Sequence, residues 1–186
     1  MKKTLYFAAF LSVTAMLVTA IAYLGFNLTE PIIAKNTIEK INTNIAILYS
    51  PEEGYSRNVD QTDNFYQEKN YKSISDVWEV LDGDGNIYVI LYNISAQGRN
   101  GLVYALIAVD PYSDTIVAVN YYSHGETPNI GEKYTREDAI ELLLDQPVDN
   151  VVVDVIAGAS TTWVAIDTMF KDIAIHYNQE EVHING

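Results

Sequence analysis

The sequence predicts an α+β domain, built on a mainly antiparallel sheet with packed helices and preceded by one N-terminal transmembrane helix. Two pairs of strand patterns, within 77–94 and 102–122, occupy the middle of the chain, and helical patterns lie on either side of them. Strands joined by short turns pair antiparallel, and strands clustered apart from helices are typical of the α+β class. The 186 residues leave room for one ordinary domain and a short extra element.

The chain opens with an uncharged apolar stretch over 4–29. It exceeds the ~20 residues that a helix needs to cross a hydrocarbon core of ~30 Å. Two lysines precede it, so the positive-inside rule predicts a cytoplasmic N-terminus and an exported remainder. A cleaved signal peptide is the alternative, because 20–22 has the small-x-small form of a cleavage site. We expect a single-pass anchor in the cell membrane over 1–29 and an extracytoplasmic domain over 30–186.

A second helix is predicted directly after this stretch, where Pro31 favours a helix start and Ile or Leu recur on one face up to Leu48. The polar segment 50–75 has little periodicity and is predicted to be a loop. The two strand pairs follow. Each is joined by a short segment rich in turn residues, at 82–86 and 110–114, so each pair is predicted to form a hairpin.

A helix is predicted after the second hairpin, where Thr135 and Asp138 approach the form of a capping box. Its expected buried face consists of Ala139, Leu142 and Leu143.

Two further elements are predicted towards the end of the chain. The valine-rich segment 150–156 indicates another strand, and 161–177 indicates a closing helix. The apolar residues of that helix are Val164, Met169, Ile173 and Ile175.

The charge balance excludes several classes of protein. With 25 acidic and 11 basic residues, the formal net charge is -14. Such a surface offers few cations to replace the counterions of a phosphate backbone, so no nucleic-acid partner is expected. The chain has no cysteine. It therefore supplies no disulfide, no cysteine ligand to zinc or to an iron–sulfur cluster, and no lipoprotein anchor.

The acidic turn 82–86 begins like a calcium-binding loop, because alternate oxygen side chains can converge on one ion. The glycine required at the sixth position is Ile87, however, and the bidentate glutamate required at the twelfth is Asn93. A plain hairpin turn is the favoured interpretation.

The three histidines, His124, His176 and His183, lack the spacing of a metal motif, and no G-x-S-x-G elbow surrounds Ser160. Neither a metal site nor a hydrolase triad is expected. His176 and His183 lie near the C-terminus and are predicted to be solvated.

Two segments carry the pattern of a ligand site. The run 124–133 contains two Gly and one Pro between a strand and a helix. It is either a structured loop or a ligand-binding loop at the end of the sheet. The run 154–162 contains a turn of small residues and then a hydroxyl-rich helix start. Gly158 allows close approach of the backbone, and a helix start favours an anion. Alternatively, Ser160 is only an N-cap.

Both runs resemble the FMN-binding domain family of the G subunit of Rnf electron-transport complexes and the C subunit of sodium-pumping NADH:quinone reductase. The family loop H-x-E-T-P-G-L-G is matched by His124, Glu126, Thr127, Pro128 and Gly131. The flavin-attachment signature D-x-x-S/T-G-A-T/S is matched by Asp154, Gly158, Ala159 and Ser160. The chain departs from the family at Asn129-Ile130, in place of Gly-Leu, and at Ala157, in place of Ser or Thr.

The resemblance implies that an FMN transferase joins the phosphate of FMN to Ser160 as a covalent phosphoester. Thr161 and Thr162 are neighbouring hydroxyls and stay alternatives for the attachment atom. The family further implies that Glu126, Thr127 and Ile130 line the isoalloxazine ring. Trp163 either contacts that ring or fills the core.

The implied function is electron transfer, with no catalytic residue and no metal in the chain. The leading hypothesis is the G subunit of an Rnf-type ion-translocating oxidoreductase, with other membrane subunits as partners. A stand-alone extracellular FMN electron carrier is one alternative. A cofactor-free binding domain on a membrane stalk is the other.

Overall fold

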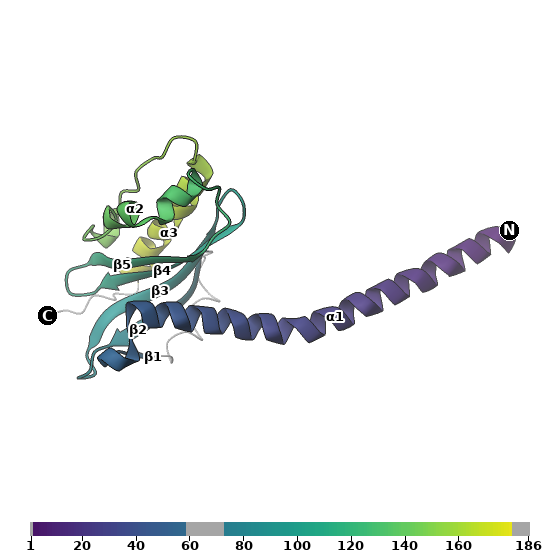
Figure 1. Ribbon diagram of the computed structural model, residues 1–186, viewed down its shortest axis with the longest axis horizontal. Helices are drawn as coiled ribbons and strands as arrows, with labels where there is room; N and C mark the ends of the chain where they lie inside the picture. Colours follow the sequence, from purple (N-terminus) through teal and green to yellow (C-terminus); the bar gives the residue numbers. More distant parts are fainter. Residues whose placement is uncertain (1, 59–72, 180–186) are drawn as a thin grey trace. The chain divides into compact units, whose positions relative to one another are not determined.

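The computed structural model describes residues 2–58 and 73–179, and the chain divides into two compact units, Met1–Thr43 and Asn44–Gly186. The expected α+β class is confirmed, because a five-stranded antiparallel sheet is combined with helices and preceded by a long apolar helix (Figure 1).

Helix α1, Lys2–Leu48, joins the two helices expected from the sequence into one. Pro31 lies inside it rather than at a helix start. A proline there removes one backbone hydrogen bond and bends a helix without having to end it, and α1 is visibly bent (Figure 1). Among the described residues, α1 is the one helix long and apolar enough to cross a membrane, by length and composition. This fits a single-pass membrane protein, and a signal sequence would pass the same test of length and composition.

The sheet follows the order of the chain, and each strand pairs antiparallel with the next. Its strands are β1 (Ser56–Asn58), β2 (Ile74–Leu81), β3 (Ile87–Gln97), β4 (Leu102–Asp110) and β5 (Thr115–Ser123). Both expected hairpins, β2–β3 and β4–β5, are confirmed. The segment expected to be a loop, 50–75, contains β1 and the start of β2, and residues 59–72 of it lie outside the described residues.

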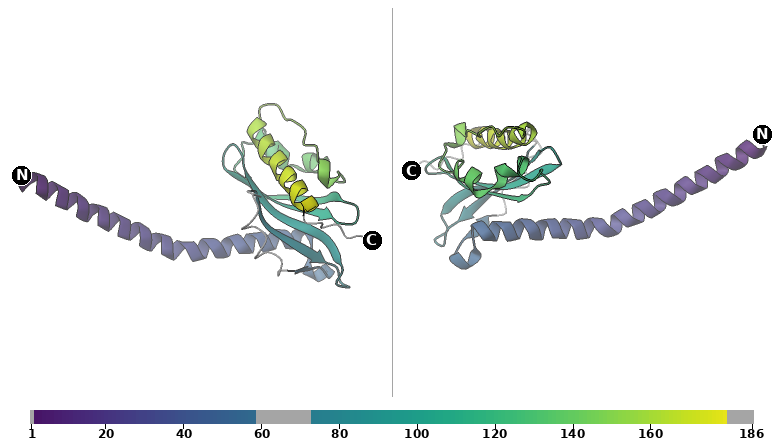
Figure 2. Two further views of the ribbon diagram at one scale, coloured as in Figure 1. Left: turned by 180° about the vertical axis from the view of Figure 1, so that it is seen from behind. Right: turned by 45° about the horizontal axis from the view of Figure 1, so that its top comes forward.

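Helix α3, Ser160–Gln179, lies across one face of the sheet (Figure 2). Met169 and Ile173 of α3 are completely buried in the same apolar cluster as Tyr92 and Ile107 from β3 and β4. Val164 and Ile175, the other two apolar residues named for this helix, are about half exposed, at 52% and 47%. The core between α3 and the sheet therefore fixes where the first turn of α3 begins.

The strand expected over 150–156 is absent, and side chains take the place of a neighbouring strand. The side chain of Gln146 pairs with both backbone groups of Val152, at 2.7 and 3.1 Å. The indole N–H of Trp163 donates to the carbonyl of Val153 at 2.8 Å. The valine run thus satisfies its backbone polar groups without a sheet ladder.

The helix predicted after Thr135 is also different from the expectation. Residues Gly131–Thr135 form a 3-10 helix, and α2 is the single turn Glu137–Glu141 with Arg136 at its N-cap and no side-chain cap. The hydroxyl of Thr135 donates to the carbonyl of Glu132 instead. Of the expected buried face, Leu143 is buried and Leu142 is 61% exposed.

His176 is buried rather than solvated. It is 2% exposed on the inner face of α3, where its Nδ1 lies 3.0 Å from the hydroxyl of Tyr92. His183 lies outside the described residues.

The acidic turn after β2 is closed by its own backbone. The carboxylate of Asp82 accepts the N–H groups of Asp84 and Asn86 at 3.0 and 2.9 Å. The hydrogen bonds from Asn86 lower the pKa of Asp82. The geometry is that of the plain turn favoured by the sequence.

Candidate functional site

The first turn of α3 presents its hydroxyl groups on different sides. Gly158 precedes it with a positive φ of 83°, a conformation that glycine adopts without steric cost. The carbonyl of Ala159 accepts the N–H of Trp163 at 2.9 Å, so Ala159 occupies the N-cap position. Ser160 is thus the first helical residue, and the N-cap alternative for Ser160 is wrong. Ser160 and Thr161 are exposed, whereas Thr162 is 1% exposed.

Glu126 is buried beneath this turn. It is 6% exposed, and its Oε2 accepts the hydroxyl of Thr162 at 2.5 Å. Its Oε1 accepts the backbone N–H of Asn100 at 3.3 Å. The side chain of Asn100 also donates to the hydroxyl of Thr127 at 3.0 Å. Three segments far apart in the sequence are therefore tied together at one carboxylate.

Two glycines leave space for that carboxylate. A Cβ on Gly131 would lie 2.3 Å from Oε2 of Glu126 and 2.5 Å from Oγ1 of Thr162. A Cβ on Gly98 would lie 2.3 Å from Oε1 of Glu126. Since real Cβ atoms do not approach other atoms this closely, both positions require glycine as long as Glu126 stays in place. This steric constraint explains why the last position of the loop motif, Gly131, is a glycine.

Asn129, where the loop departs from the family pattern, adopts a left-handed backbone conformation. Asn129 has a positive φ of 60°, which Asn tolerates better than other residues with a side chain. Its side-chain oxygen accepts from the guanidinium of Arg136 at 2.7 Å. Ile130 follows, 41% exposed, and His124 is exposed with its Nε2 3.3 Å from the hydroxyl of Thr135.

Tyr134 positions the segment that leads into α3. Its hydroxyl donates to the carbonyl of Asp154 at 3.0 Å and accepts the N–H of Ile156 at 2.8 Å. Burial raises the pKa of Tyr134, so its hydroxyl keeps the proton that it donates. One neutral phenol thus satisfies two backbone groups of a segment that has no neighbouring strand.

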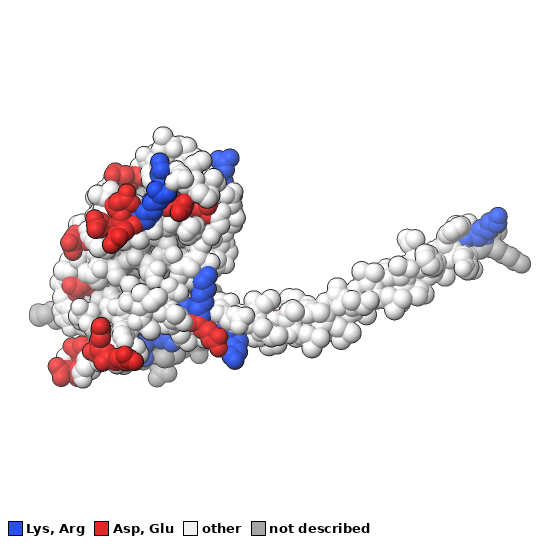
Figure 3. Space-filling view, viewed as in Figure 1, with Lys and Arg blue, Asp and Glu red and all other residues white. Residues whose placement is uncertain are grey.

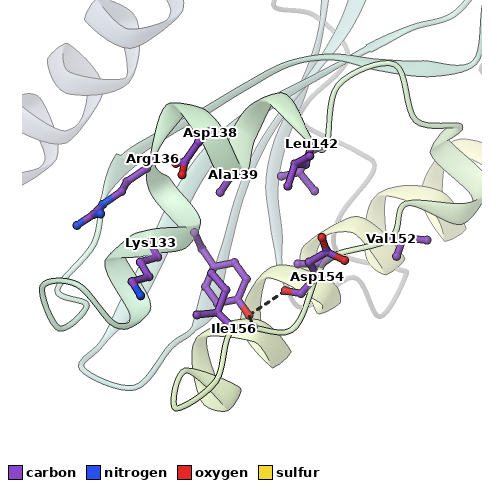
Figure 4. A pocket seen from close by; sticks show the side chains of 11 residues that line it. Lys133, Arg136, Asp138, Ala139, Leu142, Val152, Asp154 and Ile156 are labelled. Atoms are coloured by element: carbon purple, nitrogen blue, oxygen red, sulfur yellow. Dashed lines mark hydrogen bonds between the residues drawn. The ribbon is translucent and has the colours of Figure 1, made fainter.

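A cavity of about 430 Å³ opens beside Tyr134, between α2 and the segment 152–156 (Figure 4). Its apolar walls include Tyr134, Ala139, Leu143, Val153 and Ile156. Lys133, Arg136, Asp138 and Asp154 add charged groups to its rim.

We expect Tyr134→Phe to destabilise the domain by about 1–3 kcal/mol, because two part-buried hydrogen bonds to the backbone would be lost with little change in side-chain volume. Thermal unfolding of the full chain, followed by circular dichroism, measures this change. Tyr112→Phe is a matched control, because Tyr112 is 59% exposed and its hydroxyl makes only an exposed hydrogen bond, to the carbonyl of Ile87 at 3.2 Å. Equal midpoints for the two variants would contradict the role assigned to the Tyr134 hydroxyl.

The hydrogen-bond donors and the exposed hydroxyls at this site suit the binding of FMN. The first backbone N–H groups of α3 have no acceptor within their own helix, which suits a phosphate. The exposed hydroxyls of Ser160 and Thr161 adjoin them. An apolar cavity with charged groups at its rim suits a flat ring with polar edges. Within the described residues, no group of three or more His, Cys, Asp or Glu is arranged to hold a metal ion.

The structure brings together two sets of residues that the sequence named separately, because Glu126 and Thr127 of the loop meet Thr162 of α3 through Asn100. His124 and Ile130 lie on the outside of the same loop. Sequence reasoning missed Gly98, Asn100 and Tyr134. The one signal in the sequence was the turn-like run Gly98–Gly101, which resembles any hairpin connection.

Comparison with known proteins agrees with this geometry. Residues 98–174 match the FMN-binding domain family. The C subunit of the Na(+)-translocating NADH-quinone reductase of Yersinia pestis is 30% identical over 59 residues, which are 32% of this chain and 22% of that protein. The protein of the same name from Neisseria meningitidis serogroup B is 32% identical over 63 residues, 34% of this chain and 24% of that protein. The chain thus aligns with about a quarter of the length of these relatives. The resemblance inferred from the two motifs is confirmed, and residues 98–174 of this chain match an FMN-binding domain.

Proposed function

We propose that this chain is the electron-transfer flavoprotein subunit of an Rnf-type ion-translocating oxidoreductase, with FMN carried as a phosphoester on Ser160. The observation that carries the proposal is the first turn of α3, where exposed hydroxyls stand beside helix N–H groups at the end of the family signature. The similarity to the C subunit of a sodium-translocating reductase supports a place in a membrane complex. The apolar helix α1 supports attachment to the membrane.

The accessibility of the side chains favours Ser160 over Thr162 as the acceptor of FMN. The hydroxyl of Thr162 is buried and already donates to Glu126, so a transferase has no access to it. Thr161 is exposed but stands one residue beyond the position that the signature assigns. Attachment requires an FMN donor activated by a phosphoanhydride, such as a flavin dinucleotide. The hydroxyl proton leaves, the Oγ–P bond forms, the anhydride bond breaks, and the remaining nucleotide phosphate departs.

The protein holds and orients the cofactor. The first N–H groups of α3 would hold the phosphate, whose remaining negative charge is favoured by the positive end of the helix dipole. Ile130, which is 41% exposed, and the cavity beside Tyr134 would offer apolar side chains to the isoalloxazine. The bound flavin supplies redox chemistry in steps of one or two electrons. No acid or base from the chain takes part.

The proposed orientation places the N-terminus in the cytoplasm and the domain outside. Covalent attachment suits that compartment, because a dissociated flavin would be lost by dilution. Acidic side chains gather in patches on the face of the domain drawn in Figure 3, which also supports the expectation that nucleic acid is not a partner. The other membrane subunits of the complex, and the FMN transferase during maturation, are the proposed partners.

Intact-mass measurement on the full chain, co-expressed with an FMN transferase, tests this function. We expect the denatured protein to stay yellow and to gain the mass of FMN less one water. Colourless protein of unmodified mass would overturn the proposal in favour of a cofactor-free binding domain. For labelled protein, purification from mild detergent separates the two redox alternatives: co-purification of other integral membrane subunits supports the complex, and their absence supports a stand-alone carrier.

A further inference from the structure

We infer that Glu126 and Thr162 form a buried positioning pair, which holds the first turn of α3 in the orientation that presents Ser160 to the transferase. This inference rests on the proposed function and assigns to Glu126 an action through Thr162 rather than a contact with the ring. Neither residue bonds to the cofactor. They determine which hydroxyl of the turn is accessible.

The contact between the two side chains is suited to this role. The hydroxyl of Thr162 donates to a carboxylate oxygen at 2.5 Å, within the range of charge-assisted O–H···O⁻ hydrogen bonds. The two residues are 94% and 99% buried and 36 positions apart in the sequence. A bond of this kind in a water-excluded place ties the loop to the helix more firmly than a surface contact would.

The surroundings of Glu126 fit its carboxylate closely. The carboxylate lies between Gly98 and Gly131, and neither glycine leaves room for one more carbon atom. The backbone N–H of Asn100 holds the second carboxylate oxygen at 3.3 Å. The Thr162 hydroxyl therefore donates to a carboxylate that a second hydrogen bond also holds.

Helix geometry transmits this constraint to Ser160. Successive residues of an α-helix are about 100° apart, so a residue two positions earlier points about 200° away. When Thr162 faces inward to Glu126, Ser160 must face outward. The structure agrees, because Thr162 is buried and Ser160 is exposed. A turn that rotated or frayed would present Thr161 or no hydroxyl in the same place.

Thr162→Val tests the inference, because valine keeps the shape of threonine and removes the hydroxyl. We expect the initial rate of FMN attachment to full-length protein in detergent, measured by intact mass with purified transferase, to fall about 10–100-fold, as misplacement of a reacting group does. Thr162→Ser restores the hydroxyl and should recover most of the rate. Thr168→Val is the matched control, because the Thr168 hydroxyl bonds only to the helix carbonyl of Val164.

Glu126→Gln provides a second variant of unchanged size. A carboxylate accepts at both oxygens, whereas an amide accepts at one and donates from the other. Glutamine can still accept the Asn100 N–H and donate to the Thr162 hydroxyl, so the charge-assisted hydrogen bond becomes a weaker neutral one with its direction reversed. We expect a loss of labelling rate smaller than that of Thr162→Val, with peptide mapping showing part of the remaining label on Thr161.

The outcomes separate failure of the inference from failure of the proposed function. Absence of label on the unmodified chain would sink the proposed function and this inference with it. If the unmodified chain is labelled and Thr162→Val or Glu126→Gln reacts at the same rate, only the inference fails. Thr162→Ser reacting as slowly as Thr162→Val would likewise overturn it, since the methyl group and not the hydroxyl would then matter. Circular dichroism at the labelling temperature restricts the comparison to folded variants, and Thr162→Ser and Glu126→Gln decide the matter if Thr162→Val does not fold.

Discussion

Ser160→Ala should abolish covalent flavin on the full chain, with intact mass returning to that of the unmodified polypeptide. Alanine removes the acceptor oxygen and is a good helix former, so the start of α3 should stay in place. Because Ser160 is exposed and its side chain is not the cap of α3, we expect a stability change within about 0.5 kcal/mol. The label should therefore be lost from a protein that is still folded.

Two further variants make this expectation specific. Thr161→Val changes the other exposed hydroxyl of the turn and should leave the label in place. Ser160→Thr keeps an acceptor and should also be labelled. Full labelling of Ser160→Ala would show that the acceptor has been assigned to the wrong residue, and peptide mapping would then locate it. Electron transfer as the function of the chain would survive that result.

Gly131→Ala should cause a large loss of stability. The new methyl group would lie 2.3 Å from Oε2 of Glu126 and 2.5 Å from Oγ1 of Thr162. Gly131 does not have a positive φ, so space and not backbone conformation is the obstacle. Relief requires the buried carboxylate to move and to give up a hydrogen bond. Overpacking and a lost charged hydrogen bond together cost about 2–4 kcal/mol.

Thermal unfolding of the full chain measures this loss, which corresponds to a decrease in Tm of roughly 6–12 °C for a domain of this size. Gly83→Ala is the matched control. Its methyl group would lie 4.0 Å from the nearest neighbouring atom, the carbonyl oxygen of Gly54. A midpoint for Gly131→Ala equal to that of Gly83→Ala would show that Glu126 leaves its place readily, and the steric reason given for the loop glycine would be wrong.

Local chemistry predicted the parts of the fold that depend on neighbouring residues. The hairpins β2–β3 and β4–β5 were predictable, because runs of apolar residues flank short segments rich in Asp, Gly, Pro and Ser. The strand predicted over 150–156 was wrong. Valine has a high β-propensity whether or not a partner strand lies beside it. Here its partners are the side chains of Gln146, Tyr134 and Trp163. Single-sequence patterns do not show which distant side chain will take the place of a strand.

The positions of the functional residues were predictable only as two separate motifs. Family resemblance named Glu126 and Thr162 individually, but their contact depends on Asn100 and on two glycines from other segments. His176 is a second example of a position that the sequence did not predict. Its place near the C-terminus led to the prediction that it is solvated, but the packing of α3 buries it against Tyr92. Burial is a property of the assembled helix and sheet.

The sequence by itself determined the α+β class, the apolar N-terminal helix, the two hairpins and the resemblance to FMN-binding domains. These follow from residue types, periodicity and motifs that act over a few positions. Only the tertiary structure decided that Thr162 is buried while Ser160 is exposed, and that the loop and α3 share one carboxylate. The reason is physical: propensity and periodicity act between neighbours in the chain, whereas burial and hydrogen bonding of Glu126 arise when three distant segments pack together and exclude water.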